Sequence, residues 1–462
     1  MVVEVDDDLG WDVGPGCHWS VPLGVRGWVC VWVGGGVRGG AGGAFYAIFA
    51  LLRRRCGAIE DWAAGATIGG QVVPALPDLA RMRRERFARL QAGLASAGLD
   101  GLVLLGSSAV SYATGALTPS MDGDTAALFR PVAVVVAGES APHLFTMFAD
   151  GAPSDVVLHG PLFPDLDDGV FASELASLFG GSGARLGIDH LSHAMFRGLS
   201  GYEWVDASGV LGSARVLKTV DEVACIRHAQ LLNELAMEDA LALLRPGVRQ
   251  VDLSAAFLRR VFELGASAGG IDPIWQVMAP SRSAGPWTVH GDLAYPTVTS
   301  DRFLRYGDVI WVDAGIMYEG YASDYGRTWV VGSALDAVQR GQFGRWREVV
   351  DACLDVLRPG VSGLDLCKVA VAANDGVRPW IEHFYLAHGV GTDSAEMPLI
   401  GTDLGEEFDS RLVVEPGMVM VFEPVIWDEG SAGYRAEDIV AVTDNGWVKL
   451  SGSDYAPYGR LS

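Results

Sequence analysis

The sequence has few cysteines, and none of them stands in a motif that binds metal or cycles between thiol and disulfide. There are six in 462 residues, and no two are spaced as Cys-x-x-Cys. A zinc ribbon and a thioredoxin-type redox site are therefore not indicated. Scattered cysteines without such a pattern are typical of free thiols in a reducing compartment. We expect a cytoplasmic protein without disulfides.

Basic residues are also scarce. The chain has 34 Lys and Arg against 57 Asp and Glu, which gives a net charge of −23. Binding to nucleic acid relies on basic patches, so this balance argues against a nucleic-acid partner. Hydrophobic residues make up 50% and charged residues 20%, which is typical of a globular protein. The length is sufficient for two domains with complete cores.

The amino-terminal segment is rich in Gly, Val and Trp, and we expect it to contain neither a membrane span nor an export signal. Its apolar run Ala44–Leu52 is too short for a bilayer, and its arginines follow that run instead of preceding it. A Gly-x-Gly-x-x-Gly motif begins at Gly34, but the segment is too short for the dinucleotide-binding unit that this motif needs. We expect residues 1–76 to be a low-complexity leader that is disordered or foreign to the natural protein.

Residues 309–331 predict a β-hairpin that carries two aspartates. Two apolar runs, rich in β-branched and aromatic residues, flank a turn that contains glycine. With the turn centred on Tyr318 and Glu319, Asp313 lies opposite Asp324. Cβ atoms of opposed residues are about 4.5–5.5 Å apart, so the two carboxylates repel each other unless a cation lies between them.

A second predicted hairpin, residues 418–443, repeats this arrangement. Centred on Gly430, it places Glu423 opposite Glu437. Between the two hairpins in the sequence lies His388, in a turn. Four carboxylates and one imidazole form a hard, oxygen-rich set suited to two divalent ions. Either acid pair alone is equally consistent with solvated turn charges; the two pairs with the histidine favour a metal site.

These residues resemble the pita-bread metallohydrolases, which include methionine aminopeptidase, aminopeptidase P, prolidase and creatinase. The resemblance rests on the eleven-residue spacing from Asp313 to Asp324, the HGVG turn at His388, the FEP tripeptide with Glu423 and the RAED tetrapeptide with Glu437. It covers roughly residues 78–455.

The resemblance implies two folded domains. Residues 78–217 are similar to the small α/β domain at the amino terminus of creatinase and prolidase, and their alternating helices and buried strands predict a mixed sheet covered on both faces. Residues 218–457 are similar to the α+β pita-bread catalytic domain. The family also implies a homodimer.

The resemblance further implies a dinuclear metal centre. Asp313 would bind one ion, Asp324 and Glu437 would bridge both, and His388 and Glu423 would complete the second. The implied cofactors are two divalent ions: manganese, cobalt or iron, with zinc as a further option.

Three residues are candidates for catalytic roles in that site. Glu423 is a candidate general base as well as a ligand. Arg435 lies two residues before Glu437, so on a strand it shares that side chain's face and can hold the ligand carboxylates or a substrate carboxylate. His290 is a candidate for contacting substrate or carrying a proton; the alternative is a loop histidine satisfied by its neighbours.

The implied activity is that of an Xaa-Pro aminopeptidase or dipeptidase, in which water activated by the metals attacks an amide carbonyl of a short peptide or small molecule. One departure keeps alternatives open: Ala395 stands where the family pattern has a second histidine. The first alternative is a non-peptidase enzyme on the same scaffold, such as a creatinase-like or ectoine-type hydrolase or a dimethylsulfoniopropionate lyase, with Asp393 or Glu396 as the acid–base group. The second is an inactive metal-binding module.

Overall fold

The computed structural model describes most of the chain downstream of residue 75. The described residues are 18–23, 27–32, 66–68, 71–73, 75–117, 130–181, 183–190, 195, 199–267, 273–278, 280, 301–381 and 384–453. The chain divides into two compact units, Met1–Glu60 and Asp61–Ser462. Across the described ranges, no helix combines the length and the apolar character needed to cross a bilayer.

Two short antiparallel hairpins lie within residues 1–76. Strand β1 (His18–Leu23) pairs with β2 (Gly27–Trp32), and β3 (Ala66–Ile68) pairs with β4 (Gln71–Val73). The expectation that this segment is a low-complexity leader stays a prediction.

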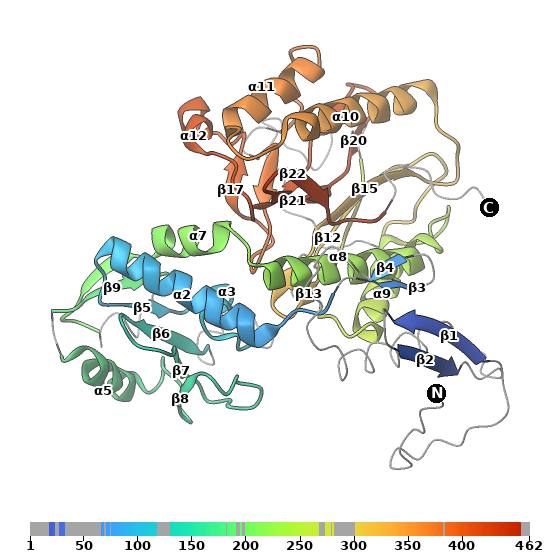
Figure 1. The fold of residues 1–462 in the computed structure, drawn as a ribbon. Helices are drawn as coiled ribbons and strands as arrows, with labels where there is room; N and C mark the ends of the chain where they lie inside the picture. Colours follow the sequence, from blue (N-terminus) through green and yellow to red (C-terminus); the bar gives the residue numbers. More distant parts are fainter. Residues whose placement is uncertain are drawn as a thin grey trace. The chain divides into compact units, whose positions relative to one another are not determined.

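The next part of the chain forms a six-stranded mixed sheet with the strand order β10-β9-β5-β6-β7-β8 (Figure 1). Strand β5 runs parallel to β9 and antiparallel to β6, which confirms the predicted mixed sheet. Its elements are α2 (Leu79–Ala97), β5 (Gly101–Leu104), α3 (Ser107–Thr114), β6 (Val132–Val136), β7 (His143–Phe145), β8 (Val157–His159), α5 (Asp168–Phe179), β9 (Arg185–Ile188), β10 (Glu203–Asp206) and α7 (Ser208–Val216).

Helix α2 is capped at both ends. The Asp78 side chain accepts hydrogen bonds from the backbone N–H groups of Ala80 and Arg81, and Gly98 ends the helix in the left-handed conformation with φ 62°. Leu90 and Leu94 of α2 are fully buried against the sheet.

In the described residues after Leu217, the chain combines small antiparallel sheets with helices. Its sheets have the strand orders β11-β12-β15, β13-β14, β17-β16-β18-β21-β22 and β19-β20. The helices are α8 (Val220–Leu241), α9 (Gln250–Glu263), α10 (Ala337–Val356), α11 (Gly363–Ala373) and α12 (Glu406–Arg411). The strands are β11 (Ile274–Val277), β12 (Val309–Ala314), β13 (Met317–Tyr318), β14 (Tyr321–Ala322), β15 (Tyr325–Val330), β16 (Ala387–Gly389), β17 (Glu396–Ile400), β18 (Val419–Phe422), β19 (Val425–Trp427), β20 (Gly433–Arg435), β21 (Asp438–Thr443) and β22 (Gly446–Lys449).

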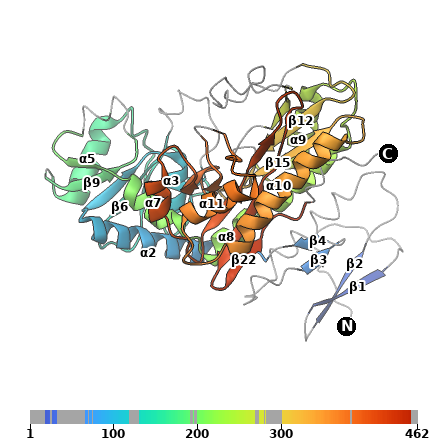
Figure 2. The ribbon, with the colours of Figure 1, turned by 90° about the horizontal axis from the view of Figure 1, so that it is seen from above.

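Helices cover these sheets on two sides. Trp346 of α10 and Leu366 of α11 pack into a buried cluster with Met420 of β18. On the other side, Phe257 of α9 packs into a cluster with Ile310 of β12. Figure 1 shows the strands between the α10–α11 layer and the α8–α9 layer, and Figure 2 shows α10 lying over the strands from above. The core therefore lies in two layers, one on each face of the strands.

The turn of the first hairpin lies one residue later in the chain than predicted, and this changes which residues face each other across the two strands. Asp313 pairs with Gly326, and Tyr318 pairs with Tyr321, so the turn is centred on Glu319 and Gly320. Both turn residues are left-handed, with φ 49° and 80°, as a type I′ turn requires. The expected direct pairing of Asp313 with Asp324 is therefore wrong: the two are diagonal neighbours on one face.

The second hairpin has the predicted register. Phe422 pairs with Asp438 on one side and Val425 with Arg435 on the other. Both pairs centre the hairpin on Gly430, so Glu423 lies opposite Glu437.

The two hairpin tips allow a test of how tightly the first hairpin is packed. Gly320 and Gly430 both have φ near 80–90°, but a Cβ on Gly320 would lie 2.7 Å from Ser111 Oγ of α3, whereas one on Gly430 would meet nothing within 4 Å. A left-handed residue with a side chain costs about 1–2 kcal/mol. We expect Gly430→Ala to lower the free energy of unfolding by about that amount, and Gly320→Ala by clearly more, as measured by chemical denaturation. Equal losses would show that the tip of the first hairpin is free of α3.

Candidate metal centre

The five predicted ligands converge from two hairpins and one neighbouring strand. Asp313 lies on β12, Asp324 directly before β15, His388 on β16, Glu423 directly after β18 and Glu437 directly before β21. All five are at most 8% exposed. Carboxylate oxygens of Asp313, Asp324 and Glu437 lie within 4.8 Å of one another, a spacing that one ion can bridge.

His388 joins the two hairpins. Its Nε2 is 3.2 Å from Asp324 Oδ2 and 3.3 Å from Glu423 Oε1. Its Nδ1 is 2.9 Å from the carbonyl oxygen of Gly389, and because a carbonyl only accepts, Nδ1 carries the hydrogen. In the neutral ring Nε2 is then the nitrogen with a free lone pair, and it faces the carboxylates.

Arg435 of β20 is the cation of this cluster. Its Nη2 is 2.7 Å from Glu437 Oε1 and also donates to Glu423 Oε2, and its Nη1 is 3.5 Å from Asp313 Oδ2. The guanidinium lies 4.2 Å from the centre of the Trp311 ring, a cation–π geometry. With three carboxylates around it, Arg435 orients the acids of both hairpins.

The pKa values of these groups reflect burial and an excess of negative charge. Burial raises the pKa of Asp313 to about 7, and it raises the pKa of Glu423 and, well above its usual range, that of Glu437. For His388, burial lowers the pKa, but the hydrogen bond to Asp324 and the charge of Glu423 outweigh it and raise the pKa to about 9. Without further positive charge the cluster therefore retains protons.

Divalent ions fit the donor set. Asp313 Oδ1, Asp324 Oδ1 and Glu437 Oε2 are buried and have no hydrogen-bond partner within the described part of the chain. If all four carboxylates were ionised, their charge would exceed that of Arg435 and a protonated His388 by two negative charges, and divalent ions would compensate this excess. Buried charges are normally paired or bound to metal, and oxygen donors with one imidazole suit hard divalent cations.

The backbones of the two hairpins approach each other closely at Gly326 and Glu437. A Cβ on Gly326 would lie 2.4 Å from the carboxyl carbon of Glu437, so a side chain there would displace that carboxylate. The N–H of Glu437 donates to the carbonyl oxygen of Gly326 at 3.0 Å. The two hairpins therefore meet backbone to backbone at this point.

Helix α8 supports the first hairpin through residues that the sequence analysis missed. Asn233 Nδ2 donates to the Ala314 carbonyl oxygen (2.7 Å) and to Ser323 Oγ (2.9 Å). Gln230 Oε1 accepts from the backbone N–H of Asp324 at 3.3 Å. Both amides are buried. No local signal in the sequence marks these two amides, because α8 is buried on most of its sides and polar and apolar residues are buried alike.

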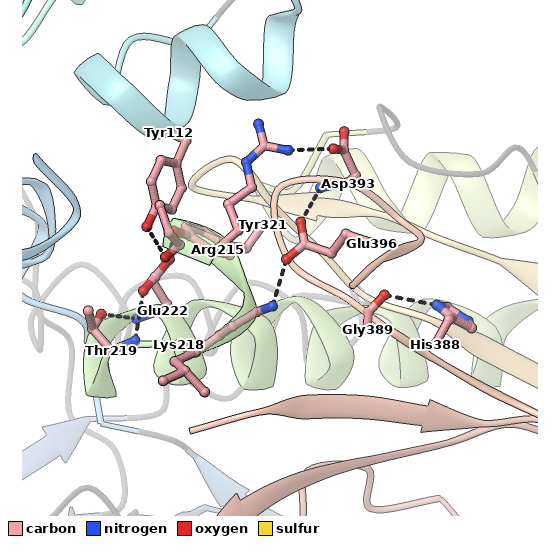
Figure 3. Close-up of polar contacts among 12 residues, drawn as sticks. Tyr112, Arg215, Lys218, Thr219, Glu222, Tyr321, His388, Gly389, Asp393 and Glu396 are labelled. Atoms are coloured by element: carbon pink, nitrogen blue, oxygen red, sulfur yellow. Dashed lines mark hydrogen bonds and ion pairs between the residues drawn. The ribbon is translucent and has the colours of Figure 1, made fainter. Parts of the chain in front are cut away.

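The remaining predicted site residues have different outcomes. His290 lies outside the described residues. Ala395 lies in the loop between β16 and β17. The two acids beside it, which were candidates for an acid–base role, are held in ion pairs: Glu396 Oε1 is 2.6 Å from Lys218 Nζ, and Asp393 Oδ2 is 2.7 Å from Arg215 Nη1 (Figure 3).

Two protein-family models match the chain. Residues 86–217 match the creatinase/prolidase N-terminal domain, and residues 224–444 match metallopeptidase family M24. The two matches adjoin, in the order that the sequence predicts.

Individual relatives agree with these matches. The chain is 30% identical over 251 residues to the Xaa-Pro dipeptidase of Pyrococcus furiosus, an alignment that covers 54% of this chain and 67% of that protein. It is 29% identical over 254 residues to an uncharacterised peptidase of Bacillus subtilis, covering 54% of this chain and 65% of the relative, just under two thirds of its length.

Solved structures show the same fold. A prolidase from Thermococcus sibiricus superposes with a TM-score of 0.65 at 22% identity, covering 81% of this chain and 98% of that one. The dipeptidase PepE from Mycobacterium ulcerans superposes with a TM-score of 0.61 at 25% identity, covering 82% and 98%. The chain therefore belongs to metallopeptidase family M24, with a creatinase/prolidase N-terminal domain ahead of the pita-bread domain that carries the carboxylate cluster.

Proposed function

We propose that the chain is a dinuclear metallopeptidase that hydrolyses short Xaa-Pro peptides. The observation that carries the proposal is the buried cluster of four carboxylates and one imidazole with unpaired oxygens, in a chain related to an Xaa-Pro dipeptidase. A homodimer and a cytoplasmic location belong to the same proposal. They are supported by the family resemblance and by the scattered cysteines.

The ligands in this proposal are Asp313, Asp324, His388, Glu423 and Glu437. When bound, two divalent ions supply Lewis acidity and lower the pKa of water towards neutrality. Manganese, cobalt or iron suits a set with four carboxylates and one nitrogen, and zinc is the further option.

The protein's own groups have three tasks. Arg435 holds Glu423 and Glu437 in place through the contacts described above, so it positions ligands; its contacts favour this role over binding a substrate carboxylate. Glu423 Oε2 is occupied by Arg435, which leaves Oε1, on the side of His388, to accept a proton as general base. Burial excludes bulk water, which strengthens these charge interactions.

The first test concerns the metals. We expect the purified protein to bind about two divalent ions per chain, as measured by elemental analysis. Asp324→Ala should remove most of this binding, because a bridging carboxylate serves both ions. Asp428→Ala is the control, since Asp428 is an acid at the tip of the second hairpin that pairs with Arg345 and lies outside the cluster. Undiminished metal content in Asp324→Ala would refute the ligand assignment.

The second test uses pH. In the metal-free protein Asp313, Glu437 and His388 have raised pKa values, so near pH 7 they hold protons that an ion must displace. We expect metal affinity to fall as the pH drops through 7, and binding at pH 7 to release protons, as counted by titration calorimetry in buffers of different ionisation enthalpy. Binding without proton release would show that the cluster is already fully deprotonated.

The third test concerns Ala395. Removing one donor that stabilises a developing oxyanion typically costs about 10²–10³ in kcat. We expect the unmodified protein to cleave Xaa-Pro dipeptides more slowly, by roughly 10², than a family member with the histidine, and Ala395→His to raise kcat. Ser394→His, one residue away, is the control. Turnover by the unmodified protein that equals that of such a family member would show that Ala395 is not a functional departure.

The alternative of a non-peptidase enzyme needs Asp393 or Glu396 as an acid–base group. Because both are held by cations, they are poorly placed for proton transfer, and peptide hydrolysis stays the better-supported function.

A further inference from the structure

Two basic side chains at the junction of the domains reach the loop that follows His388. Lys218, in the linker between α7 and α8, has its Nζ 2.6 Å from Glu396 Oε1. Arg215, in the last turn of α7, has its Nη1 2.7 Å from Asp393 Oδ2. Figure 3 shows both side chains pointing at the loop from one side, with His388 at its other end.

The Glu396 carboxylate folds back into the loop that it ends. Its Oε2 accepts from the N–H of Asp393 at 3.4 Å, and a Cβ on Gly391 would lie 2.4 Å from its Oε1. The carbonyl oxygen of Gly391 in turn accepts from the N–H of Ala322 at 2.7 Å, two residues before Asp324. The path of the loop is therefore tied both to this carboxylate and to the first hairpin.

Lys218 is fixed at its backbone as well. Its N–H donates to the carbonyl oxygen of Gly417 at 2.7 Å, and Leu217 forms a β-bridge with Met418. This bridge leads directly into β18, whose last residue, Phe422, directly precedes Glu423. One residue thus connects the strand before Glu423 with the loop after His388.

The ion pair is shielded from water. The side chains of Lys218 and Glu396 are 1% and 8% exposed. In such a pair each charge depends on the other, because removal of one partner leaves an uncompensated buried charge. The buried pair therefore restricts the positions of its two side chains more than a solvated pair does. An example of a solvated pair is Arg411 with Glu407, whose side chains are 72% and 85% exposed.

The loop also contains a buried threonine. Thr392 is 6% exposed, and its Oγ1 is without a hydrogen-bond partner among the residues that the structure describes. Thr392 lies next to Asp393, which Arg215 holds. Arg215 and Lys218 therefore hold a segment that contains the buried hydroxyl of Thr392, four residues after His388.

We propose that Lys218 and Glu396 are positioning residues for the reaction: their ion pair sets the shape of loop 390–395 beside His388 and thereby the rate of turnover. The proposal rests on the proposed function. Displacement of reacting groups by about 1 Å can cost as much as 10²-fold in rate, so loosening this loop should affect catalysis while the ligands remain.

The experiment compares Lys218→Met and Glu396→Gln with a matched junction variant, Arg81→Met. Arg81 also joins the two domains by an ion pair, to Asp221 at 2.7 Å, but it does not contact the loop. We expect both loop variants to keep their metal content, to lose about 10- to 100-fold in kcat on Xaa-Pro dipeptides with a smaller change in KM, and to exchange amide hydrogens faster in residues 389–396. Arg81→Met should lose stability, with kcat and loop exchange unchanged.

Two further variants guard against simple misfolding. Lys218→Arg keeps the charge and should retain most of the rate, and the exchange of charges in K218E with E396K should recover part of the loss seen in either single variant. If Lys218→Met matches Arg81→Met in both kcat and loop exchange, the ion pair is only structural and the proposal is overturned.

Failure of the proposed function is recognised separately. If the unmodified protein cleaves no Xaa-Pro dipeptide, the function is wrong, and the loop is then tested by hydrogen exchange and by the visible spectrum of the cobalt-loaded protein, which reports on His388. Unchanged exchange and an unchanged spectrum in Lys218→Met would overturn the positioning role on their own.

Discussion

The burial of four carboxylates around one guanidinium is the constraint on which the rest of the carboxy-terminal domain depends. Arg435 contacts three of the four acids, and it is itself fixed over the Trp311 ring. One arginine does not balance this charge, and burial, together with the neighbouring carboxylates, raises the pKa values of Asp313 and Glu437. Such a cluster is costly without ions, so the fold around it has to be stabilised independently of the site.

That stability comes from backbone pairing at the points where the acids emerge. Each acid of the two hairpins lies at or next to the end of a strand. The backbone pairing of that strand fixes the direction in which the carboxylate points. Two glycines leave room for carboxylates that pack against the backbone: Gly326 faces Glu437, and Gly391 faces Glu396. Groups held in place by backbone pairing lose little conformational freedom when a ligand binds, and such preorganisation favours tight binding.

The sequence was sufficient for some of this arrangement and not for the rest. The second hairpin could be registered because its loop is symmetric about Gly430. The first could not, because its turn places Glu319 in the left-handed region, which a residue other than glycine or asparagine seldom occupies. The alternation of helices and strands in residues 78–217 could be predicted from the local sequence pattern. The residues that support the site could not be predicted in this way. Asn233, for example, donates a hydrogen bond to Ala314, which lies 81 residues further along the chain. The neighbouring sequence does not distinguish a buried amide side chain such as that of Asn233 from one that faces solvent.

The junction between the domains is linked to the site in the same non-local way. Lys218 and Glu396 are 178 residues apart, yet their ion pair determines where the chain runs after His388. Because Asp393 and Glu396 anchor the loop on both sides of Ala395, the side chain at position 395 is not what gives the loop its shape. Position 395 can then change without moving the ligands. In the proposed function the five ligands and the contact to substrate are therefore separable, so a chain could keep the proposed ligands while position 395 departs from the family pattern.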